Sequence, residues 1–344
     1  MTRLPLLPHL TRLTVSRGTP ARGGRTAAAS LLITALTAVT AACSSGAYAP
    51  TAVPKASTAT APATTAPSPS APAPGADQCL ASYRPSALPP PGKGSGTTLA
   101  AIYKRGRLKA GVSADTLLLG ARNPLSGSIE GFDIDMLRAI STALFGRPDR
   151  VTLTVLTAAQ RIPALESGKV DVVARNMTIN CDRWKQVAFS SEYYRAGQKL
   201  LVPSGSPIRS RSDLGGKRVC APTGSTSLTT ISQVPGVVPV AADTHTACLI
   251  LFQQSKVDAI TGDDTVLAGL SAQDPYAEVV GSAFSTEPYG LAMAQDHVDL
   301  VRFVNAVLTK IRADGTWTKD YDRWLKAPLG PAPAPPKPVY GRTP

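Results

Sequence analysis

One pattern occurs twice in this 344-residue chain, and it limits the fold more than any other feature. The stretches Leu165-Glu-Ser-Gly-Lys-Val-Asp-Val-Val173 and Phe252-Gln-Gln-Ser-Lys-Val-Asp-Ala-Ile260 each read as a helix end, a turn and a buried strand. Strands that alternate with short helices favour an α/β fold, in which helices cover a parallel-rich sheet. The echo is too short to prove a duplication, but it supports two α/β lobes of similar construction.

The order of the candidate strands predicts how the two lobes are connected. Strands near 198–202 and 288–294 would both cross between the lobes. The second lobe would then be an insertion of residues 204–286, while the first lobe would comprise residues 77–203 and 287–327. Residues 328–344 are rich in proline, so we expect an unstructured tail there.

The N-terminal region has the composition of an export signal followed by a tether. Several arginines precede an apolar run that is shorter than the ~20 residues of a membrane span. The run ends in Thr-Ala-Ala-Cys43, which resembles the bacterial lipobox where a cysteine is acylated; cleavage nearby by an ordinary signal peptidase is the alternative. We therefore expect a lipoprotein signal peptide in residues 1–43. Residues 44–76, nearly all Ala, Pro, Ser and Thr, are expected to form an extended tether.

The charge of the chain argues against nucleic acid as a partner. Loss of residues 1–43 removes five arginines and no acids, so the formal net charge falls from +13 to +8. The remaining Lys and Arg residues are scattered and form no basic run interleaved with aromatic residues. Attraction to an acidic ligand or to an anionic lipid surface remains compatible with this charge.

Four cysteines remain downstream of the signal, which in an exported chain indicates two disulfides and leaves three pairings open. We expect Cys79 to pair with Cys181 and Cys220 with Cys248, because each bond would then lie within one lobe. The rival interpretation is a metal site at His245-Thr-Ala-Cys248. No second closely spaced pair of Cys or His supports it, so no metal is expected.

Polar side chains follow three of the candidate strands. In open α/β sheets ligands bind beyond the carboxyl ends of strands, which is where Thr178, Arg183 and Asp263 fall. Ser225 and Thr226 open a candidate helix, whose free N–H groups favour an anion; helix capping is the alternative. Arginine suits a carboxylate and aspartate an ammonium group. The pattern predicts a zwitterion trapped between two hinged lobes.

Catalytic motifs are absent from the sequence. Neither Gly-x-Ser-x-Gly nor a phosphate-binding Gly-x4-Gly-Lys-Ser/Thr motif occurs, and the two histidines beyond the signal lie in no nucleophile motif. No catalytic residue and no cofactor are therefore expected.

Several longer motifs carry a resemblance to a known family. They are Gly131-Phe-Asp-Ile-Asp-Met, Pro163-Ala-Leu-Glu-Ser-Gly-Lys-Val-Asp, Met177-Thr-Ile with Arg183, Phe189-Ser-Ser-Glu-Tyr-Tyr194, Asp213-Leu-Gly-Gly-Lys and Asp314-Gly-Thr. In this order the chain resembles the family 3 extracellular solute-binding proteins, the amino-acid receptors of ABC importers, over about residues 99–325. The cysteine positions and Asp274-Pro-Tyr are further similar to actinobacterial glutamate-type members. The resemblance implies a two-lobed periplasmic-binding-protein-like fold of type II, with lobes joined by two crossing strands.

The resemblance also implies roles for particular residues. Thr178 and Arg183 would bind the α-carboxylate of an amino acid, with help from Ser225 and Thr226. Asp263 would bind the α-ammonium group.

The resemblance implies further groups beside Asp263, and the sequence departs from the family pattern at two places. The Asn176 carbonyl and Asp115 would assist Asp263. The loop Thr116-Leu-Leu-Leu-Gly lacks the aromatic residue that many members stack on the ligand, and Pro222 stands where some glutamine receptors have Lys. Arg122 and Arg175 are our candidates for contact with an acidic ligand side chain.

These observations predict a monomeric receptor, lipid-anchored at the extracellular face of the cytoplasmic membrane. It would bind glutamate or a related acidic or amide amino acid and deliver it to an ABC permease. A first alternative is a ligand-sensing lipoprotein that signals to a membrane sensor. A second is an enzyme of dehydratase or transglycosylase type on the same fold, which would need an acid or base facing the ligand. A purely structural lipoprotein would have no enclosed polar cleft.

Overall fold

The computed structural model describes residues 79–89 and 96–344, which lie in one compact unit, Pro69–Pro344. The predicted signal peptide, the predicted tether and Cys43 lie outside the described residues. Among the described residues no helix is long and apolar enough to cross a membrane.

Lobe 1, the part of the chain built on the first sheet, has five strands in the order β5-β1-β6-β14-β7. The strands are β1 (Leu108–Val112), β5 (Val151–Val155), β6 (Val172–Ala174), β7 (Val187–Phe189) and β14 (Ala292–Ala294). Strand β1 is parallel to β5 and β6, whereas β14 is antiparallel to β6 and β7. The carboxyl ends of β1 and β6 therefore meet at one edge of this sheet.

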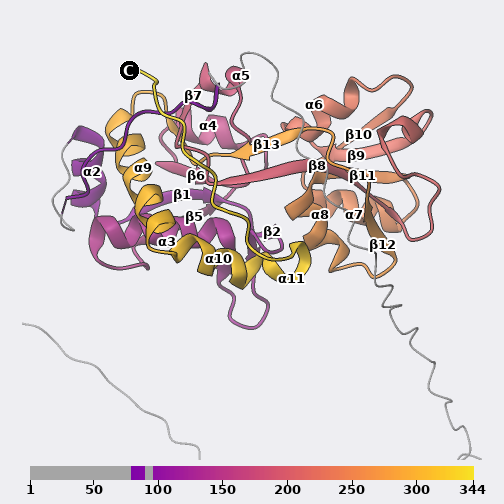
Figure 1. Cartoon of the computed structure of the whole chain (residues 1–344), viewed down its shortest axis with the longest axis horizontal. Helices are drawn as coiled ribbons and strands as arrows, with labels where there is room; N and C mark the ends of the chain where they lie inside the picture. Colours follow the sequence, from indigo (N-terminus) through magenta and orange to yellow (C-terminus); the bar gives the residue numbers. More distant parts are fainter. Residues whose placement is uncertain (1–78, 90–95) are drawn as a thin grey trace, which may run out of the picture. The chain divides into compact units, whose positions relative to one another are not determined.

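Helices cover the sheet of lobe 1 (Figure 1). They are α2 (Thr97–Arg105), α3 (Phe132–Phe145), α4 (Arg161–Glu166), α5 (Cys181–Trp184), α9 (Val298–Ala313) and α10 (Thr316–Trp324). A last helix, α11 (Lys326–Leu329), follows α10. Helix α3 shows why the sequence forms them, because Ile134, Leu137, Ile140 and Leu144 recur at helical spacing and are all buried. A small sheet of β2 (Asp115–Thr116), β3 (Gly120–Arg122) and β4 (Ile129–Glu130) precedes α3.

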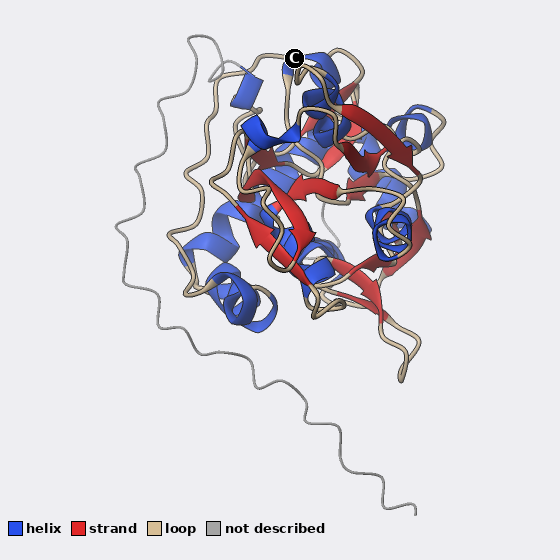
Figure 2. Cartoon of the chain, turned by 90° about the vertical axis from the view of Figure 1, so that its right-hand side faces the viewer, coloured by secondary structure: helices blue, strands red, loops and turns tan. Residues whose placement is uncertain are grey.

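Lobe 2, the part built on the second sheet, has the strand order β10-β9-β11-β8-β12. The strands are β8 (Tyr194–Pro203), β9 (Arg218–Pro222), β10 (Val238–Ala242), β11 (Ala259–Asp263) and β12 (Ala277–Val280), and the helices are η1 (Arg211–Leu214), α6 (Thr226–Ser232), α7 (His245–Gln253) and α8 (Asp264–Ser271). Neighbouring residues on each strand point to opposite faces, so Leu200 and Leu201 belong to different apolar clusters. Helices cover both faces of this sheet as well (Figures 1 and 2).

Two strands connect the lobes, as the sequence predicts. Strand β8 is ten residues long and begins in lobe 1, where Tyr194 packs, and ends in the sheet of lobe 2. Strand β13 (Thr286–Tyr289) returns beside it and pairs antiparallel with it, from Thr286 opposite Gly197 to Tyr289 opposite Tyr194. The chain between them contains β9 to β12 and α6 to α8.

The C-terminal segment differs from the unstructured tail expected for residues 328–344. Tyr340 forms a β-bridge with Ser82, and Arg342 donates from Nε to the carbonyl of Ala81. Proline-rich composition indicates only that a segment cannot build its own core. This segment instead lies against lobe 1 through a few aromatic, cationic and backbone groups, which composition alone does not reveal.

Both expected disulfides form in the structure. Cys79 joins Cys181 with Cα atoms 5.1 Å apart, and Cys220 joins Cys248 with Cα atoms 5.6 Å apart. The first bond lies within lobe 1 and the second within lobe 2. Because Cys248 is in a disulfide, the rival metal site at His245 loses its thiolate ligand.

Candidate ligand-binding site

A small polar cavity lies where the two lobes meet, and the volume within it that is open to the centre of a water molecule is about 10 Å³, roughly the space of one water. Its walls come from both lobes and are Ala158, Arg161, Arg175, Asn176, Thr178, Arg183, Pro222, Ser225, Thr226, Ser227, His245 and Asp263. Seven of the nine ligand-binding residues predicted from the sequence are among them. The other two, Asp115 and Arg122, are treated separately below.

The cavity is placed by strand ends. Arg175, Asn176 and Thr178 follow β6 of lobe 1, while Asp263 ends β11 of lobe 2. Ser225 and Thr226 follow β9 at the start of α6. Each lobe thus presents the carboxyl edge of its parallel strands to the other, the usual position of a ligand in open α/β sheets.

Arg183 is held by hydrogen bonds to backbone carbonyls of both lobes. Its Nη1 donates to the Thr178 carbonyl at 2.7 Å, and its Nη2 donates to the Gly224 carbonyl of lobe 2 at 3.2 Å. The side chain is buried, and burial lowers the pKa of the guanidinium while the carboxylates of Glu287 and Asp263 act to raise it. A guanidinium has five N–H donors, so donors remain for an anion.

Asp263 is the acidic counterpart on lobe 2. Its Oδ2 accepts a hydrogen bond from the Tyr289 hydroxyl at 2.6 Å, whereas its buried Oδ1 has no partner among the described residues. Burial, together with the charge of the neighbouring Glu287, raises the pKa of Asp263 to about 8, against the lowering effects of Tyr289 and Arg161. A buried acceptor without a donor is costly, so this oxygen is suited to a donor brought by a ligand.

Glu287 on β13 is a residue of this site that the sequence did not identify. Its Oε2 accepts hydrogen bonds from Thr178 Oγ1 of lobe 1 at 2.6 Å and from Thr226 Oγ1 of lobe 2 at 2.8 Å. Its Oε1 accepts from Ser285 Oγ at 2.6 Å. One carboxylate on a crossing strand therefore joins hydroxyls of both lobes.

Two further arginines give the cavity its positive charge. Arg161 at the start of α4 donates to the carbonyls of Ala158 (2.9 Å), Arg175 (3.1 Å) and Gly224 (3.0 Å), so most of its donors hold backbone. Arg175 is buried, and its Nε has no partner among the described residues. Burial lowers the pKa of both guanidinium groups, and the mutual repulsion of Arg161 and Arg183 contributes to the lowering at Arg161.

Asn176, at the cavity wall, has a left-handed backbone conformation. Its φ is 35°, a left-handed region that Asn tolerates better than most residues. Its N–H donates to Asp133 Oδ2 at 2.8 Å, while Asp133 Oδ1 accepts from the Tyr193 hydroxyl at 2.6 Å. Burial raises the pKa of Asp133 to about 6. Asp133 fixes the loop, and the Asn176 side-chain Oδ1 has no partner among the described residues.

Ser225, at the start of α6, both caps this helix and lines the cavity. Ser225 Oγ accepts from the Leu228 N–H at 3.0 Å and donates to the Pro222 carbonyl at 2.6 Å, so this side chain caps α6. Thr226 donates to Glu287 as described above. Both residues still line the cavity, but their hydroxyl protons are already used within the protein.

Asp115 lies near the cavity but does not line it. It accepts from Ser113 Oγ at 2.8 Å, and its carbonyl accepts from Thr246 Oγ1 of lobe 2 at 3.1 Å. Burial acts to raise the pKa of Asp115, but hydrogen bonds from Thr244 and Ser113 and the charge of Arg175 lower it overall. Asp115 is thus a carboxylate beside Arg175.

Arg122 is not brought to the cavity. It is exposed on the hairpin of β3 and β4, and its Nη1 donates to the Gly127 carbonyl at 2.6 Å. His245 does line the cavity, where its Nε2 lies 3.3 Å from the Thr261 carbonyl. Burial and the charge of Arg175 lower its pKa to about 4, so this imidazole is neutral at pH 7. Among the described residues no group of His, Cys, Asp and Glu is arranged to hold a metal ion.

Comparison with known families decides the class of protein. A model of the family described as bacterial extracellular solute-binding proteins, family 3, matches residues 108–327, which is most of the described chain. The chain belongs to this family. The family membership and the two crossing strands confirm the fold class predicted from the sequence.

Relatives of this solute-binding protein are amino-acid receptors by name. It is 36% identical to the ABC transporter glutamine-binding protein GlnH of Bacillus subtilis over 231 residues, which cover 67% of this chain and 85% of that protein. It is 31% identical to the glutamate-binding protein GluB of Corynebacterium efficiens over 249 residues, covering 68% and 83%. Among solved structures, an ancestral arginine-binding protein bound to glutamine has a TM-score of 0.61 at 35% identity, covering 64% of this chain and 98% of that one.

The sequence missed two residues that hold the site of this solute-binding protein together. Arg161 follows strand β5 of its own lobe at the start of α4 and lines the cavity, but it stands in no motif that marks it. Glu287 lies on the crossing strand β13, outside the cavity wall, and accepts hydrogen bonds from hydroxyls of both lobes. The run Glu287-Pro-Tyr289 belongs to the second crossing strand, β13, and the sequence assigns its glutamate no role.

Proposed function

We propose that this protein is an extracellular receptor that encloses a polar amino acid between its two lobes and passes it to an ABC importer. The observation that carries the proposal is the pairing of charges across one cavity. Arg183 of lobe 1 and the unpartnered Oδ1 of Asp263 of lobe 2 both belong to its wall. Arg183 would bind the α-carboxylate and Asp263 the α-ammonium group of the same molecule.

The remaining groups support a polar side chain on the ligand. Arg175 offers a buried Nε–H and Asn176 a buried Oδ1, neither with a partner among the described residues. A carboxylate or a carboxamide could accept from Arg175, and a carboxamide could also donate to Asn176. We propose glutamate or a related acidic or amide amino acid as the ligand, in keeping with relatives named for glutamine and glutamate.

The cellular setting is part of the same proposal. The family is extracellular, and the N-terminal sequence has the form of a lipoprotein signal ending at Cys43. We propose that the protein is anchored by a lipid at Cys43 and acts as a monomer beside a membrane permease. The enzyme alternative is not favoured, because relatives are named as binding proteins and the neutral ring of His245 already lies near the Thr261 carbonyl.

Calorimetry tests the proposal directly. The full chain, freed of carried-over ligand by unfolding and refolding, is titrated with each standard amino acid, and L-glutamate, L-glutamine or a close relative is expected to bind. Arg183→Ala should weaken that binding by at least about 100-fold, since a bidentate charged hydrogen bond is worth roughly 3 kcal/mol.

A matched control separates loss of the site from general damage. Arg302 is an exposed arginine on α9, remote from the cavity wall, so Arg302→Ala should bind with wild-type affinity. Absence of binding for every amino acid, or an unchanged affinity in Arg183→Ala, would contradict the proposal. Recovery of a chemically altered amino acid would instead favour the enzyme alternative.

A further inference from the structure

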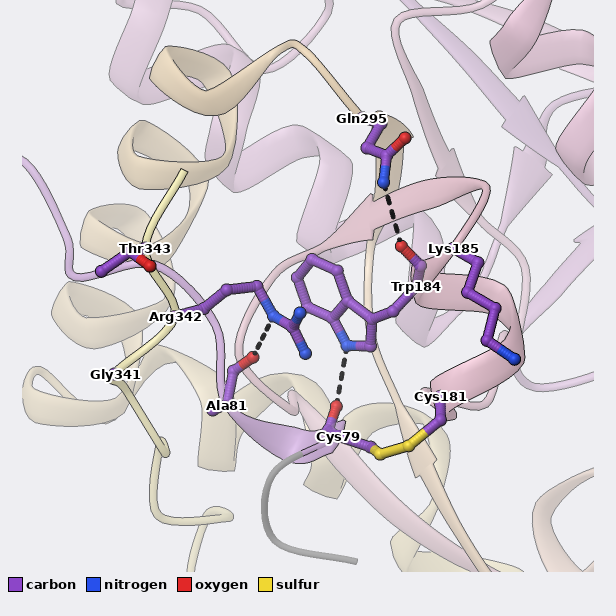
Figure 3. A pocket seen from close by; sticks show the side chains of 9 residues that line it. All are labelled: Cys79, Ala81, Cys181, Trp184, Lys185, Gln295, Gly341, Arg342 and Thr343. Carbon is purple, nitrogen blue, oxygen red and sulfur yellow. Dashed lines mark hydrogen bonds between the residues drawn. A yellow bond between two sulfur atoms is a disulfide. The ribbon is translucent and has the colours of Figure 1, made fainter.

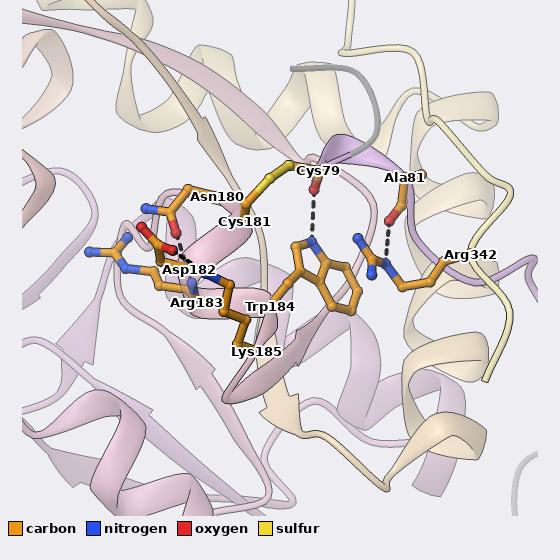
Figure 4. The surroundings of a disulfide bond; sticks show 9 residues. All are labelled: Cys79, Ala81, Asn180, Cys181, Asp182, Arg183, Trp184, Lys185 and Arg342. Atoms are coloured by element: carbon orange, nitrogen blue, oxygen red, sulfur yellow. Dashed lines mark hydrogen bonds and ion pairs between the residues drawn. A yellow bond between two sulfur atoms is a disulfide. The ribbon is translucent and has the colours of Figure 1, made fainter. Parts of the chain in front are cut away.

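Helix α5, which carries Arg183, cannot hold its own position. It is four residues long, Cys181–Trp184, and a helix of one turn has almost no intrinsic stability. Asn180, which caps the helix at its N-terminus, accepts with Oδ1 from the Arg183 N–H at 2.9 Å. Arg183, which lines the cavity, projects from one side of α5, whereas Cys181 and Trp184 point toward the segment of Cys79 and Ala81 (Figure 4).

The N-terminal end of the described chain is fastened to this helix. Cys79 is joined to Cys181 by a disulfide, and the Cys79 carbonyl accepts from Trp184 Nε1 at 2.7 Å. A covalent bond and a hydrogen bond therefore connect residue 79 to both ends of α5 (Figure 4). Tyr83, further along the same segment, packs edge-on against the Trp184 ring with centroids 6.1 Å apart.

The C-terminal segment of the chain packs on the same tryptophan ring. The Arg342 guanidinium carbon lies 3.8 Å from the centroid of the Trp184 ring, a cation–π contact (Figure 3). Arg342 Nε also donates to the Ala81 carbonyl at 3.0 Å, and the Ser82 N–H donates to the Val339 carbonyl at 3.0 Å. The two ends of the described chain thus lie side by side on α5.

We propose that residues 79–83 and 339–342 form a terminal clamp that positions Arg183 and thereby sets the affinity for the ligand carboxylate. This inference rests on the proposed function and adds positioning residues to it: Cys79, Cys181, Trp184 and Arg342. The clamp does not touch the cavity, since none of these four residues lines it. It acts through the backbone of α5, because a displacement of that helix displaces the guanidinium with it.

The geometry makes the affinity sensitive to the clamp. The bonds from Arg183 to Thr178 and Gly224 fix the far end of the side chain, but only while its Cα stays in place. Charged hydrogen bonds weaken steeply when distance or angle departs from the optimum. A helix of one turn that is freed from the clamp would present the guanidinium in several orientations.

The decisive experiment is a double-mutant cycle on the full chain, titrated with L-glutamate and in parallel with L-glutamine. The Cys79→Ser/Cys181→Ser variant should bind about tenfold more weakly than wild type. In an Arg183→Lys background the same serine substitutions should change the affinity by less than about twofold, because the positioned group is already gone. A purely structural role would instead give the same tenfold loss in both backgrounds and would overturn the proposal.

A second variant covers the case in which loss of the disulfide impairs folding. Arg342→Ala keeps the disulfide, and we expect about a threefold loss of affinity together with a change in tryptophan fluorescence. Wild-type affinity in both clamp variants would also overturn the proposal. If wild type itself binds no amino acid, the proposed function fails, which this design distinguishes from failure of the clamp.

Discussion

Asp263 is the side chain whose protonation should control binding. One carboxylate oxygen accepts from Tyr289, and the other faces the cavity without a partner among the described residues. Because burial raises its pKa to about 8, this group carries a proton for most of the time in the free protein at pH 7. An ammonium group, however, is bound by the deprotonated form.

Ligand binding should therefore release a proton at pH 7. The apparent affinity should fall as pH decreases from 8 to 6, by up to tenfold per pH unit, because the proton must leave before the ammonium group binds. Calorimetry at pH 7 in buffers of different ionisation enthalpy measures the protons released.

A neighbouring carboxylate provides the control for this experiment. Asp263→Asn should abolish the proton release, whereas Asp264→Asn should keep it, because Asp264 Oδ1 is already bonded to the Thr265 N–H and lies outside the cavity wall. The raised pKa also affects the free protein: its stabilising contribution is complete below the unfolded value near 3.8 and is lost as pH rises through about 8. Binding independent of pH from 6 to 8 would contradict this role.

Individual site residues could be predicted where they follow a strand of their own lobe. Thr178, Arg183 and Asp263 were found on that basis, and the structure places them in one cavity. Arg161 also follows a strand of its own lobe, β5, but stands in no motif that marks it. Glu287 could not be found, because it acts through hydroxyls of the two lobes that become neighbours only in the folded protein. Arg122 was a candidate for contact with an acidic ligand side chain, but it does not line the cavity and its Nη1 donates to the Gly127 carbonyl on the hairpin of β3 and β4.

At the scale of elements, one of the two crossing strands also carries a side chain that joins the lobes by hydrogen bonds. Glu287 on β13 accepts hydrogen bonds from Thr178 and Thr226, one from each lobe. These bonds exist only while the two threonines are close, and their oxygens lie 3.3 Å apart. The carboxylate thus stabilises the closed arrangement of the lobes.

Replacement of this carboxylate by an amide should loosen the closed state. Glu287→Gln exchanges an oxygen acceptor for an NH₂ donor and removes the charge that strengthens three hydrogen bonds. We expect ligand affinity to fall about tenfold, equivalent to about 1.4 kcal/mol, measured by calorimetry. Small-angle scattering should show a more open free protein.

A buried glutamate away from the cleft gives the matched control. Glu192 pairs with Arg195 in lobe 1 at 2.5 Å and does not line the cavity. Glu192→Gln should lower stability without changing ligand affinity. An unchanged affinity in Glu287→Gln would show that its carboxylate does not contribute to closure.

Elements with regular patterns were predictable, and short or irregular ones were not. The repeated turn with Lys-Val-Asp gave both α/β lobes, and the apolar spacing in α3 gave its buried face. The C-terminal segment was expected to be unstructured because its composition has no periodicity. Its contacts depend on Tyr340 and Arg342 meeting the N-terminal segment, which is a property of the folded chain.

At the scale of the whole molecule, each lobe has its own apolar core. One large cluster fills lobe 1, and two smaller clusters lie on the two faces of the lobe 2 sheet. Val266 of α8 is an exception, because this lobe 2 residue packs with the lobe 1 cluster. The lobes are also joined by the paired strands, by the polar groups of the cavity and by the hydrogen bond from Thr246 to the Asp115 carbonyl.

A ligand that contacts both lobes should therefore stabilise the molecule as a unit. At a free concentration 100 times its Kd, the expected stabilisation is about 2.7 kcal/mol, and the thermal transition should rise with ligand concentration. Differential scanning calorimetry measures this shift. Arg183→Ala, with a Kd at least about 100-fold higher, should gain at most about 0.4 kcal/mol at the same concentration. A wild-type protein whose transition is insensitive to its ligand would contradict enclosure between lobes.

The neighbouring crossing strands have an evolutionary consequence. The chain leaves lobe 1 along β8 and returns along β13, so the whole of lobe 2 enters and exits at adjacent points. Domains whose ends lie close together tolerate exchange. Recombination with a homologous gene needs only two junctions to replace this cassette, and it would retain Arg183 while changing the wall that contains Asp263. New ligand preferences can thus arise by shuffling half of the pocket.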